Sequence, residues 1–213
     1  MEATAMTRSS ASEHIGFIDW AVASQAHPHE MVCGDAYCVT QIANGALICV
    51  IDGLGHGPEA AEASRTAIAA ISNHRDDAAE EIVAQCHDAL KSTRGAVLSL
   101  AIVNSMHNRL TWVGIGNIEG ILLHAEAQHE WLPLRAGIVG CRMPSIRAIE
   151  MPISPGDLLV MFSDGITSHL LDRMYINREP VEVAERIIRT QIRRTDDALV
   201  LVARYLGNTE SIG

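Results

Sequence analysis

The sequence predicts an α+β fold in which two antiparallel β-sheets stack face to face and helices cover the outside of the sandwich. Two observations lead to this expectation. Most apolar stretches are short and follow one another directly, separated by turn residues, as in strands joined by hairpins. Stretches with helical spacing fall into two separate groups. Strands and helices therefore do not alternate, which disfavours a parallel βαβ sheet.

The first half of the chain is expected to contain three strands followed by two helices. Asn44-Gly45 lies between two apolar runs and is a strong hairpin signal. Pro58 and the acidic Glu59 suit the beginning of a helix, because proline has no amide hydrogen to satisfy and a carboxylate is favoured at the positive end of the helix dipole. The expected elements are strands at 15–24, 36–42 and 46–51 and helices at 59–74 and 77–91.

The second half is expected to consist mainly of strands. Turn-like pairs such as His107-Asn108 separate its apolar runs, and Asp164-Gly165 ends the strongly apolar run before it abruptly. The expected elements are strands at 96–104, 109–115, 120–124, 130–133, 146–151, 158–163 and 198–205, and helices at 166–171 and 180–194.

A chain of 213 residues with 48% hydrophobic content suits one large domain with a substantial core. We expect a flexible N-terminal tail at 1–13, a single domain over 14–207 and a C-terminal tail at 208–213. The sequence has no apolar stretch of about 18 residues and no block that resembles a signal peptide. We therefore expect no membrane association and a cytoplasmic location.

Charge and cysteine content exclude some classes of function. The net charge of -10 disfavours nucleic-acid binding, because phosphates would be repelled at long range, but it is compatible with an acidic site that holds divalent cations. The five cysteines are odd in number and show no CxxC spacing. We expect reduced thiols rather than a disulfide framework or a zinc site.

Four acidic positions share one context, at the edge of a predicted strand beside a glycine or a second acid. Magnesium and manganese prefer oxygen ligands and usually take only a few carboxylates from a protein. An isolated Asp-Gly is more often a turn, so the prediction depends on the whole set in its order along the chain. The four positions are Gly34-Asp35, Asp52-Gly53, Asp164-Gly165 and Asp196-Asp197.

Two neighbouring cations can activate a water molecule as nucleophile and neutralise charge on phosphoryl oxygens. Phosphoryl transfer needs little further chemistry from the protein, since positioning and electrostatics supply most of its catalysis. Gly53 leaves the backbone free to approach a metal, which makes its carbonyl a candidate ligand. The acidic positions therefore suggest a metal-dependent phosphoryl-transfer site.

Several segments resemble the type 2C (PPM) metal-dependent Ser/Thr protein phosphatases, in particular their bacterial SpoIIE-like branch. The resemblance runs from about residue 15 to 206, and its most specific parts are the DGLGHG segment and the downstream FSDG. The matching segments are GDAYCV at 34–39, VIDGLGHGPEAAEAS at 50–64, TWVGIGNIEGIL at 111–122, LLVMFSDGI at 158–166 and TDDALVLVARY at 195–205.

The resemblance implies two divalent cations, Mn²⁺ or Mg²⁺, at one end of a sandwich of two antiparallel sheets flanked by helices. Asp197 is a second choice for the last ligand, and register between it and its neighbour stays open. The implied catalytic residues are Asp35, Asp52, Asp164 and Asp196. By the resemblance, Asp52 bridges both metals and the Gly53 carbonyl binds one of them. Asp164 and Asp196 bind the other metal, and Asp35 acts through a metal-bound water.

The chain departs from the family pattern at three places. Leu199 lies where a Thr or Ser is common, three residues after the last metal-binding Asp. The only arginine before Asp35 is Arg8, so no phosphate-binding arginine is evident there. Leu54 replaces the histidine that many members have directly after the Asp-Gly pair, and the nearest histidine is His56, whose role stays open between catalysis and packing.

Other polar residues are expected to be structural. Gly114, Gly116 and Asn117 should form a turn near the site, because no helix follows them as in a nucleotide-binding loop. His27 and His29 show no metal-ligand spacing on a common element and are expected at the surface.

The resemblance implies a protein phosphatase acting on phosphoserine or phosphothreonine. Within the branch, a bare catalytic domain is similar to the feedback phosphatases of bacterial stress-response modules. The implied partner is a phosphorylated STAS-domain protein, either a stressosome scaffold or an anti-sigma-factor antagonist. Two alternatives stay open: a phosphatase fold that is catalytically weak or inactive and works by binding, and a phosphatase of small molecules.

Overall fold

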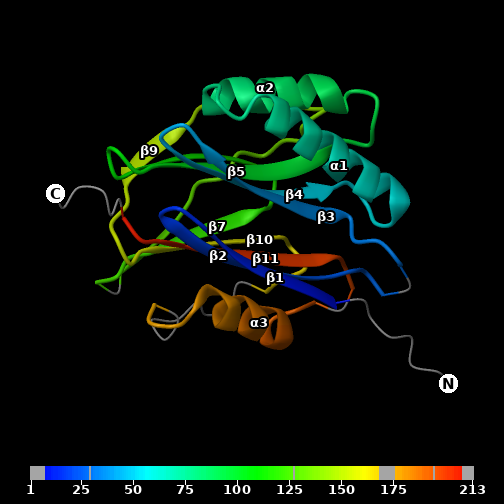
Figure 1. Ribbon diagram of the computed structural model, residues 1–213. Coiled ribbons are helices and arrows are strands. Elements are labelled where there is room, and N and C mark those ends of the chain that lie inside the picture. Colours follow the sequence, from blue (N-terminus) through cyan, green and yellow to red (C-terminus); the bar gives the residue numbers. More distant parts are fainter. Residues whose placement is uncertain (1–7, 29, 127, 168–175, 194, 208–213) are drawn as a thin grey trace.

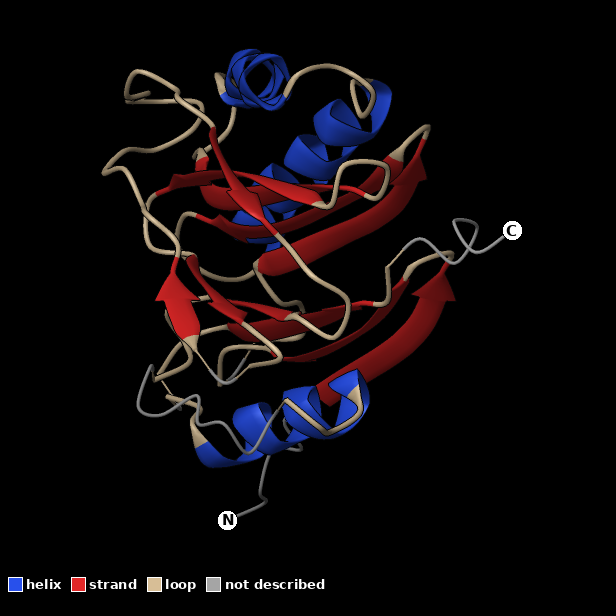
Figure 2. Ribbon diagram, turned by 90° about the vertical axis from the view of Figure 1, so that its left-hand side faces the viewer, coloured by secondary structure: helices blue, strands red, loops and turns tan. Residues whose placement is uncertain are grey.

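Two antiparallel sheets lie face to face in the computed structural model, with helices on both outer surfaces (Figure 1, Figure 2). This layered arrangement confirms the α+β fold predicted from the sequence. The structure describes residues 8–28, 30–126, 128–167, 176–193 and 195–207.

One sheet has six strands and the other has five, and all paired strands run antiparallel. The six-stranded sheet has the order β1 (Arg8–Ile15), β2 (Ile18–Gln25), β11 (Ala198–Tyr205), β10 (Leu158–Phe162), β7 (Glu119–Leu123) and β8 (His129–Trp131). The five-stranded sheet has the order β3 (Asp35–Ile42), β4 (Gly45–Gly53), β5 (Ala96–Asn104), β6 (Arg109–Ile115) and β9 (Ile149–Pro152).

Three helices of the described residues cover the two outer faces. The helices α1 (Pro58–Asn73) and α2 (Ala79–Leu90) lie on the five-stranded sheet, and α3 (Pro180–Thr190) lies on the six-stranded sheet (Figure 1). In the part of the chain that the structure describes, no helix is both long and apolar enough to cross a membrane.

Both sheets are buried on their two faces, which explains why their central strands are apolar at nearly every position. In β4, Ile48 and Val50 face the core between the sheets, whereas Leu47 and Ile51 face α1 and α2. Because successive side chains of a strand point to opposite faces, this double burial requires an uninterrupted apolar run.

The N-terminal strand corrects part of the expected tail. Residues 8–13 do not belong to a tail but form most of β1, whose register runs from Arg8 opposite Gln25 to Ile15 opposite Ile18. Backbone hydrogen bonds to β2 hold this edge strand, and they do not require its side chains, which are mostly polar, to be apolar. Residues 1–7 and the expected C-terminal tail at 208–213 lie outside the described residues.

The region after β10 also differs from the expectation. A helix was predicted at 166–171, but Ile166 forms a β-bridge with Ile192, and the amide of Thr167 donates to the Gln191 carbonyl over 2.8 Å. The remainder of that predicted helix lies outside the described residues. The helix predicted at 180–194 ends earlier, at Thr190, because the chain turns there to pair with the segment after β10.

Candidate active site

The first two predicted acids lie directly opposite each other on neighbouring strands. Asp35 is the first residue of β3, Asp52 is the penultimate residue of β4, and the register pairs the two. The Asn44-Gly45 hairpin sets this register, so the beginning of one strand meets the end of the next.

The other sheet supplies the second pair of acids by the same geometry. Phe162, at the end of β10, pairs with Val200 near the beginning of β11. Asp164 follows β10 and Asp196 precedes β11, so both lie at the same edge of their sheet. The two sheets therefore present acidic residues at one end of the sandwich.

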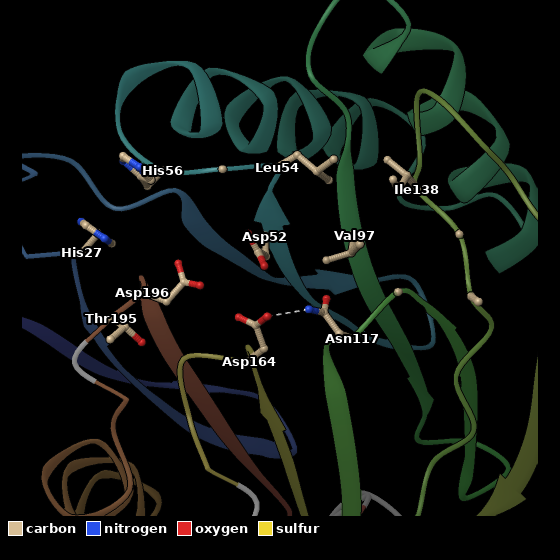
Figure 3. A pocket seen from close by; sticks show the side chains of 14 residues that line it. His27, Asp52, Leu54, His56, Val97, Asn117, Ile138, Asp164, Thr195 and Asp196 are labelled. Carbon is tan, nitrogen blue, oxygen red and sulfur yellow. Dashed lines mark hydrogen bonds between the residues drawn. The ribbon is translucent and has the colours of Figure 1, made fainter.

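Three of the four acids line one cavity of about 530 Å³ between the edges of the two sheets. Figure 3 shows Asp52, Asp164 and Asp196 directed toward a common space. Asp35 is more deeply placed, with 8% of its surface exposed, and is not among the residues that line the cavity. The structure thus brings the predicted carboxylates into one region but gives them unequal access to it.

Burial and mutual repulsion raise the pKa values of these carboxyl groups. Burial is the largest cause for Asp35, whose pKa lies well above its usual range, and the charge of Asp52 adds to the rise. Burial also raises the pKa of Asp52 to about 7, with further contributions from the charges of Asp164 and Asp196. A cluster of this kind is costly unless it is protonated or neutralised by cations.

The ionised form of Asp164 is less unfavourable than that of Asp35 or Asp52, because Asp164 is more exposed and two neighbours favour its negative charge. Burial and the charge of Asp196 raise its pKa, whereas the charge of Arg193 and a hydrogen bond from Asn117 oppose the rise. The Asn117 side-chain amide donates to Asp164 Oδ2 over 2.7 Å (Figure 3). An ionised Asp164 is therefore oriented toward the cavity by a neutral donor.

Gly53 is needed for the packing of α1. A Cβ atom at this position would lie 2.0 Å from the carbonyl oxygen of Ala60, in the first turns of the helix. The glycine thus allows α1 to approach the end of β4 closely. This close approach explains the glycine without reference to a metal, and its carbonyl remains a candidate ligand only by its place beside Asp52.

Asp196 and Asp197 have different surroundings. The buried Asp197 carboxylate accepts hydrogen bonds from the backbone amides of His27, at 2.7 Å, and Gly34, at 3.0 Å. Asp196 accepts a hydrogen bond from the backbone amide of Asp197 and lines the cavity. Asp197 thus fixes the loop between β2 and β3, whereas Asp196 faces the space where a ligand could bind.

Sequence analysis did not identify Ser163 as part of the site. Its hydroxyl donates to Asp35 Oδ2 over 2.6 Å and accepts from the Leu199 backbone amide over 2.9 Å. Its place directly before Asp164, in the FSDG segment, is the only signal the sequence offered. The side chain of Leu199 lies in the core between the sheets, so only its backbone contributes here.

Asn117 was expected to form part of a turn, and the structure shows this turn together with a side-chain contact in the cavity. The turn is present, since Gly116 has a positive φ of 97° that glycine adopts readily. The Asn117 side chain nevertheless lines the cavity and donates to Asp164. The sequence placed this turn near the site but could not show which way the amide points.

The prediction that His27 is a surface residue is correct only in part, because the residue is half-buried. Its ring lines the cavity and stacks on that of His56, with centroids 4.5 Å apart and an angle of 11° between the planes. His56 Nδ1 lies 2.8 Å from Glu30 Oε1 and also lines the cavity. The two imidazoles therefore form one side of the candidate site (Figure 3), while His29 lies outside the described residues.

The donor chemistry of the cavity suits hard divalent cations. Carboxylate oxygens from Asp52, Asp164 and Asp196 line it, and oxygen ligands of this kind are the ones that magnesium and manganese prefer. As the side chains are placed, no group of three or more His, Cys, Asp or Glu residues in the described ranges is close enough together to hold a metal ion. Like-charged carboxylates repel one another when no cation lies between them.

The sandwich of two antiparallel sheets is a fold shared with the solved structure of a serine/threonine phosphatase, PstP/Ppp of Mycobacterium tuberculosis, which has a TM-score of 0.72. The chain belongs to the SpoIIE family, because the family model described as Stage II sporulation protein E (SpoIIE) matches residues 43–206. It is therefore a member of the PPM-type serine/threonine protein phosphatases, as the sequence segments indicated.

The similarity to individual proteins agrees with this family. The phosphoserine phosphatase RsbX of Bacillus subtilis (strain 168) is 26% identical over 145 residues, which cover 65% of this chain and 72% of RsbX. A second similar protein is a structure from work on the bacterial stressosome, a modular system that has been adapted to control secondary messenger signalling. It is 31% identical, with a TM-score of 0.82, and the match covers 88% of this chain and 99% of the chain in that structure.

Two further solved structures share the fold and contain metal ions. RsbX in complex with magnesium has a TM-score of 0.84 at 20% identity and covers 92% of this chain and 100% of its own. The catalytic domain of the phosphatase PstP with two manganese ions has a TM-score of 0.68 at 21% identity and covers 89% of this chain and 98% of its own. Related phosphatases therefore bind magnesium or manganese.

Proposed function

We propose that this protein hydrolyses phosphoserine or phosphothreonine on a phosphorylated STAS-domain protein of a bacterial stress-signalling complex, as an RsbX-like phosphatase with two Mn²⁺ or Mg²⁺ ions. The observation that carries the proposal is the meeting of Asp52, Asp164 and Asp196 at one cavity from the edges of both sheets. The similarity to RsbX and to a structure from work on the bacterial stressosome supports the choice of partner. A cytoplasmic location belongs to the same proposal.

In the proposed site, the carboxylates of Asp52, Asp164 and Asp196 and the carbonyl of Gly53 would hold the two cations. When bound, the cations would supply an activated water as nucleophile and neutralise charge on the phosphoryl oxygens. Asn117 holds Asp164 in place through its side-chain amide.

Asp35 has a supporting role in this proposal. It is buried and receives the Ser163 hydroxyl, so it is restrained in one orientation opposite Asp52. Such a carboxylate suits a contact through an intervening water better than direct exposure to substrate. Phosphate binding would then depend chiefly on the cations, because no arginine lines the cavity in the described residues.

Turnover of a chromogenic phosphate ester tests the metal-dependent activity. We expect hydrolysis with added Mn²⁺ or Mg²⁺ and its loss with a chelator. Asp52→Ala and Asp164→Ala should abolish turnover while keeping the native circular dichroism spectrum, and Asp76→Ala, an exposed acid before α2, is the matched control. Full activity of Asp52→Ala or Asp164→Ala would refute the two-metal site, and an inactive wild type would favour a binding protein with a phosphatase fold.

The substrate is tested separately with phosphorylated proteins. The enzyme and Mn²⁺ are incubated with a kinase-phosphorylated STAS scaffold protein and, in parallel, with a phosphorylated anti-sigma-factor antagonist, and phosphate loss is followed by intact mass. We expect dephosphorylation of the scaffold. Loss of phosphate from the antagonist alone would contradict the RsbX-like assignment and leave a phosphatase of the SpoIIE type.

A further inference from the structure

One wall of the cavity is apolar and has no place in the phosphate chemistry. Leu54, Val97 and Ile138 line the same space as the carboxylates, and Figure 3 shows them on the side away from Thr195 and Asp196. We call these three residues the apolar wall. A phosphoryl group binds through its oxygens and gains nothing from aliphatic neighbours, so the wall calls for a different explanation.

The apolar wall is held by backbone hydrogen bonds around the beginning of β5. The Leu54 amide donates to the Gly95 carbonyl over 3.0 Å. Ala96 and Val139 exchange two hydrogen bonds, at 3.0 and 2.8 Å, and these place the Ile138 segment beside β5. The wall is therefore formed before any ligand binds, which lowers the entropic cost of binding.

Core packing leaves part of the apolar wall uncovered. Val97 is 8% exposed and belongs to the core between the sheets, whereas Leu54 and Ile138 are only half-buried. The cavity, at about 530 Å³, has the size of a pocket for a larger group than phosphate alone. Apolar surface in such a pocket is favourable mainly when a ligand removes it from water.

We propose that the apolar wall binds an apolar side chain next to the phosphorylated residue of a protein substrate. The phosphate lies at the carboxylates, and the neighbouring aliphatic side chain lies on Leu54 and Ile138. The acidic half and the apolar half of the cavity therefore bind two parts of one peptide. This inference rests on the proposed function and adds a sequence preference to it. An aliphatic contact of this size should change kcat/KM by about tenfold.

A set of phosphoserine peptides tests the preference. The parent peptide has alanine around the phosphoserine, and each of the four nearest positions is replaced in turn by Leu or by Glu. Phosphate release is measured in Mn²⁺, with N-acetyl-O-phosphoserine amide as the minimal substrate. We expect wild-type kcat/KM to be about tenfold higher for Leu than for Glu at one position or more.

Variants then locate the preference in the wall. Ile138→Gln should bring the Leu-to-Glu ratio close to one, and Ile138→Leu should keep it. Met31→Gln is the matched control, because Met31 is 85% exposed and follows Glu30 in the loop that carries His27. Melting temperatures show that each variant is folded, and the ratio within one variant does not depend on the active fraction of the sample.

The outcomes separate this inference from the proposed function. Hydrolysis of all peptides at equal rates, or a ratio that survives Ile138→Gln, would overturn the role of the apolar wall alone. A ratio lost in Met31→Gln but not in Ile138→Gln would also overturn it and move the contact to the loop. No hydrolysis of any peptide by a wild type that dephosphorylates the STAS scaffold protein would overturn this inference alone, whereas inactivity on both would refute the proposed function as well.

Discussion

Asp35 and Asp52 lie opposite each other across β3 and β4, and burial raises the pKa of both carboxyl groups. The charge of Asp52 adds to the rise for Asp35, and the charges of Asp164 and Asp196 add to the rise for Asp52, whereas a hydrogen bond with Asp35 lowers the pKa of Asp52. The metal-free fold therefore carries an electrostatic cost at the end of the sandwich where the candidate site lies.

The stability of the metal-free protein should depend on this cost. Folding raises the pKa of Asp52 from 3.8 to about 7, so the folded state binds more protons than the unfolded state between these values. Stability from this group is complete below pH 3.8 and is lost as the pH rises through about 7. A shift of this size corresponds to on the order of a few kcal/mol.

Asp52→Asn should remove that loss. We expect its free energy of unfolding, relative to wild type, to increase from pH 4.5 to pH 7.5, as measured by urea denaturation in the presence of a chelator. Asp76→Asn serves as the exposed control and should run parallel to wild type. A difference between Asp52→Asn and wild type that stays constant over this range would contradict the raised pKa.

The two neighbouring acids before β11 should respond differently to the same substitution. Asp196→Asn should lose far more activity than Asp197→Asn, because Asp196 lines the cavity. Asp197→Asn should instead lower the free energy of unfolding by about 1–3 kcal/mol, since one amide oxygen would replace two carboxylate oxygens that each accept a backbone amide. Activity and denaturation curves are measured on both variants. The reverse order of activities would shift the ligand to Asp197.

Removing the donor to Asp164 should weaken metal binding without abolishing it. Asn117→Ala leaves the carboxylate in place but free to rotate, and the loss of such a supporting contact typically weakens metal affinity by about 10–100-fold. Activity is titrated with Mn²⁺ to obtain the apparent affinity. Asn73→Ala, at the end of α1, is the control. An unchanged Mn²⁺ titration in Asn117→Ala would exclude a positioning role for this amide.

The Ser163 hydroxyl should contribute to stability, because it joins the two sheets through Asp35 and the Leu199 backbone. Ser163→Ala leaves a buried carboxyl group and a buried amide without their partner, which should cost about 1–3 kcal/mol in thermal or urea denaturation. Ser9→Ala removes an exposed hydroxyl pair with Ser24 and should stay within about 0.5 kcal/mol of wild type. Equal effects of the two variants would contradict this assignment.

Strands bounded by turn residues were the most predictable part of the fold. The strands predicted at 96–104, 109–115 and 198–205 match β5, β6 and β11 residue for residue. Their apolar runs are long because both faces are buried, and polar turns mark their ends. The edge strand β1 was not predicted. Backbone hydrogen bonds to β2 hold it in place, and its mostly polar side chains show no strand pattern in the sequence.

The sequence alone determined which acids to consider, because Asp35, Asp52, Asp164 and Asp196 stand beside predicted strand edges in a recognisable order. The tertiary structure decided their partners. Ser163 donates a hydrogen bond to Asp35, 128 positions away in the sequence, and Asn117 donates one to Asp164, 47 positions away. Contacts of this range depend on how two sheets stack and on the direction of single side chains, and neither local spacing nor strand propensity carries that information.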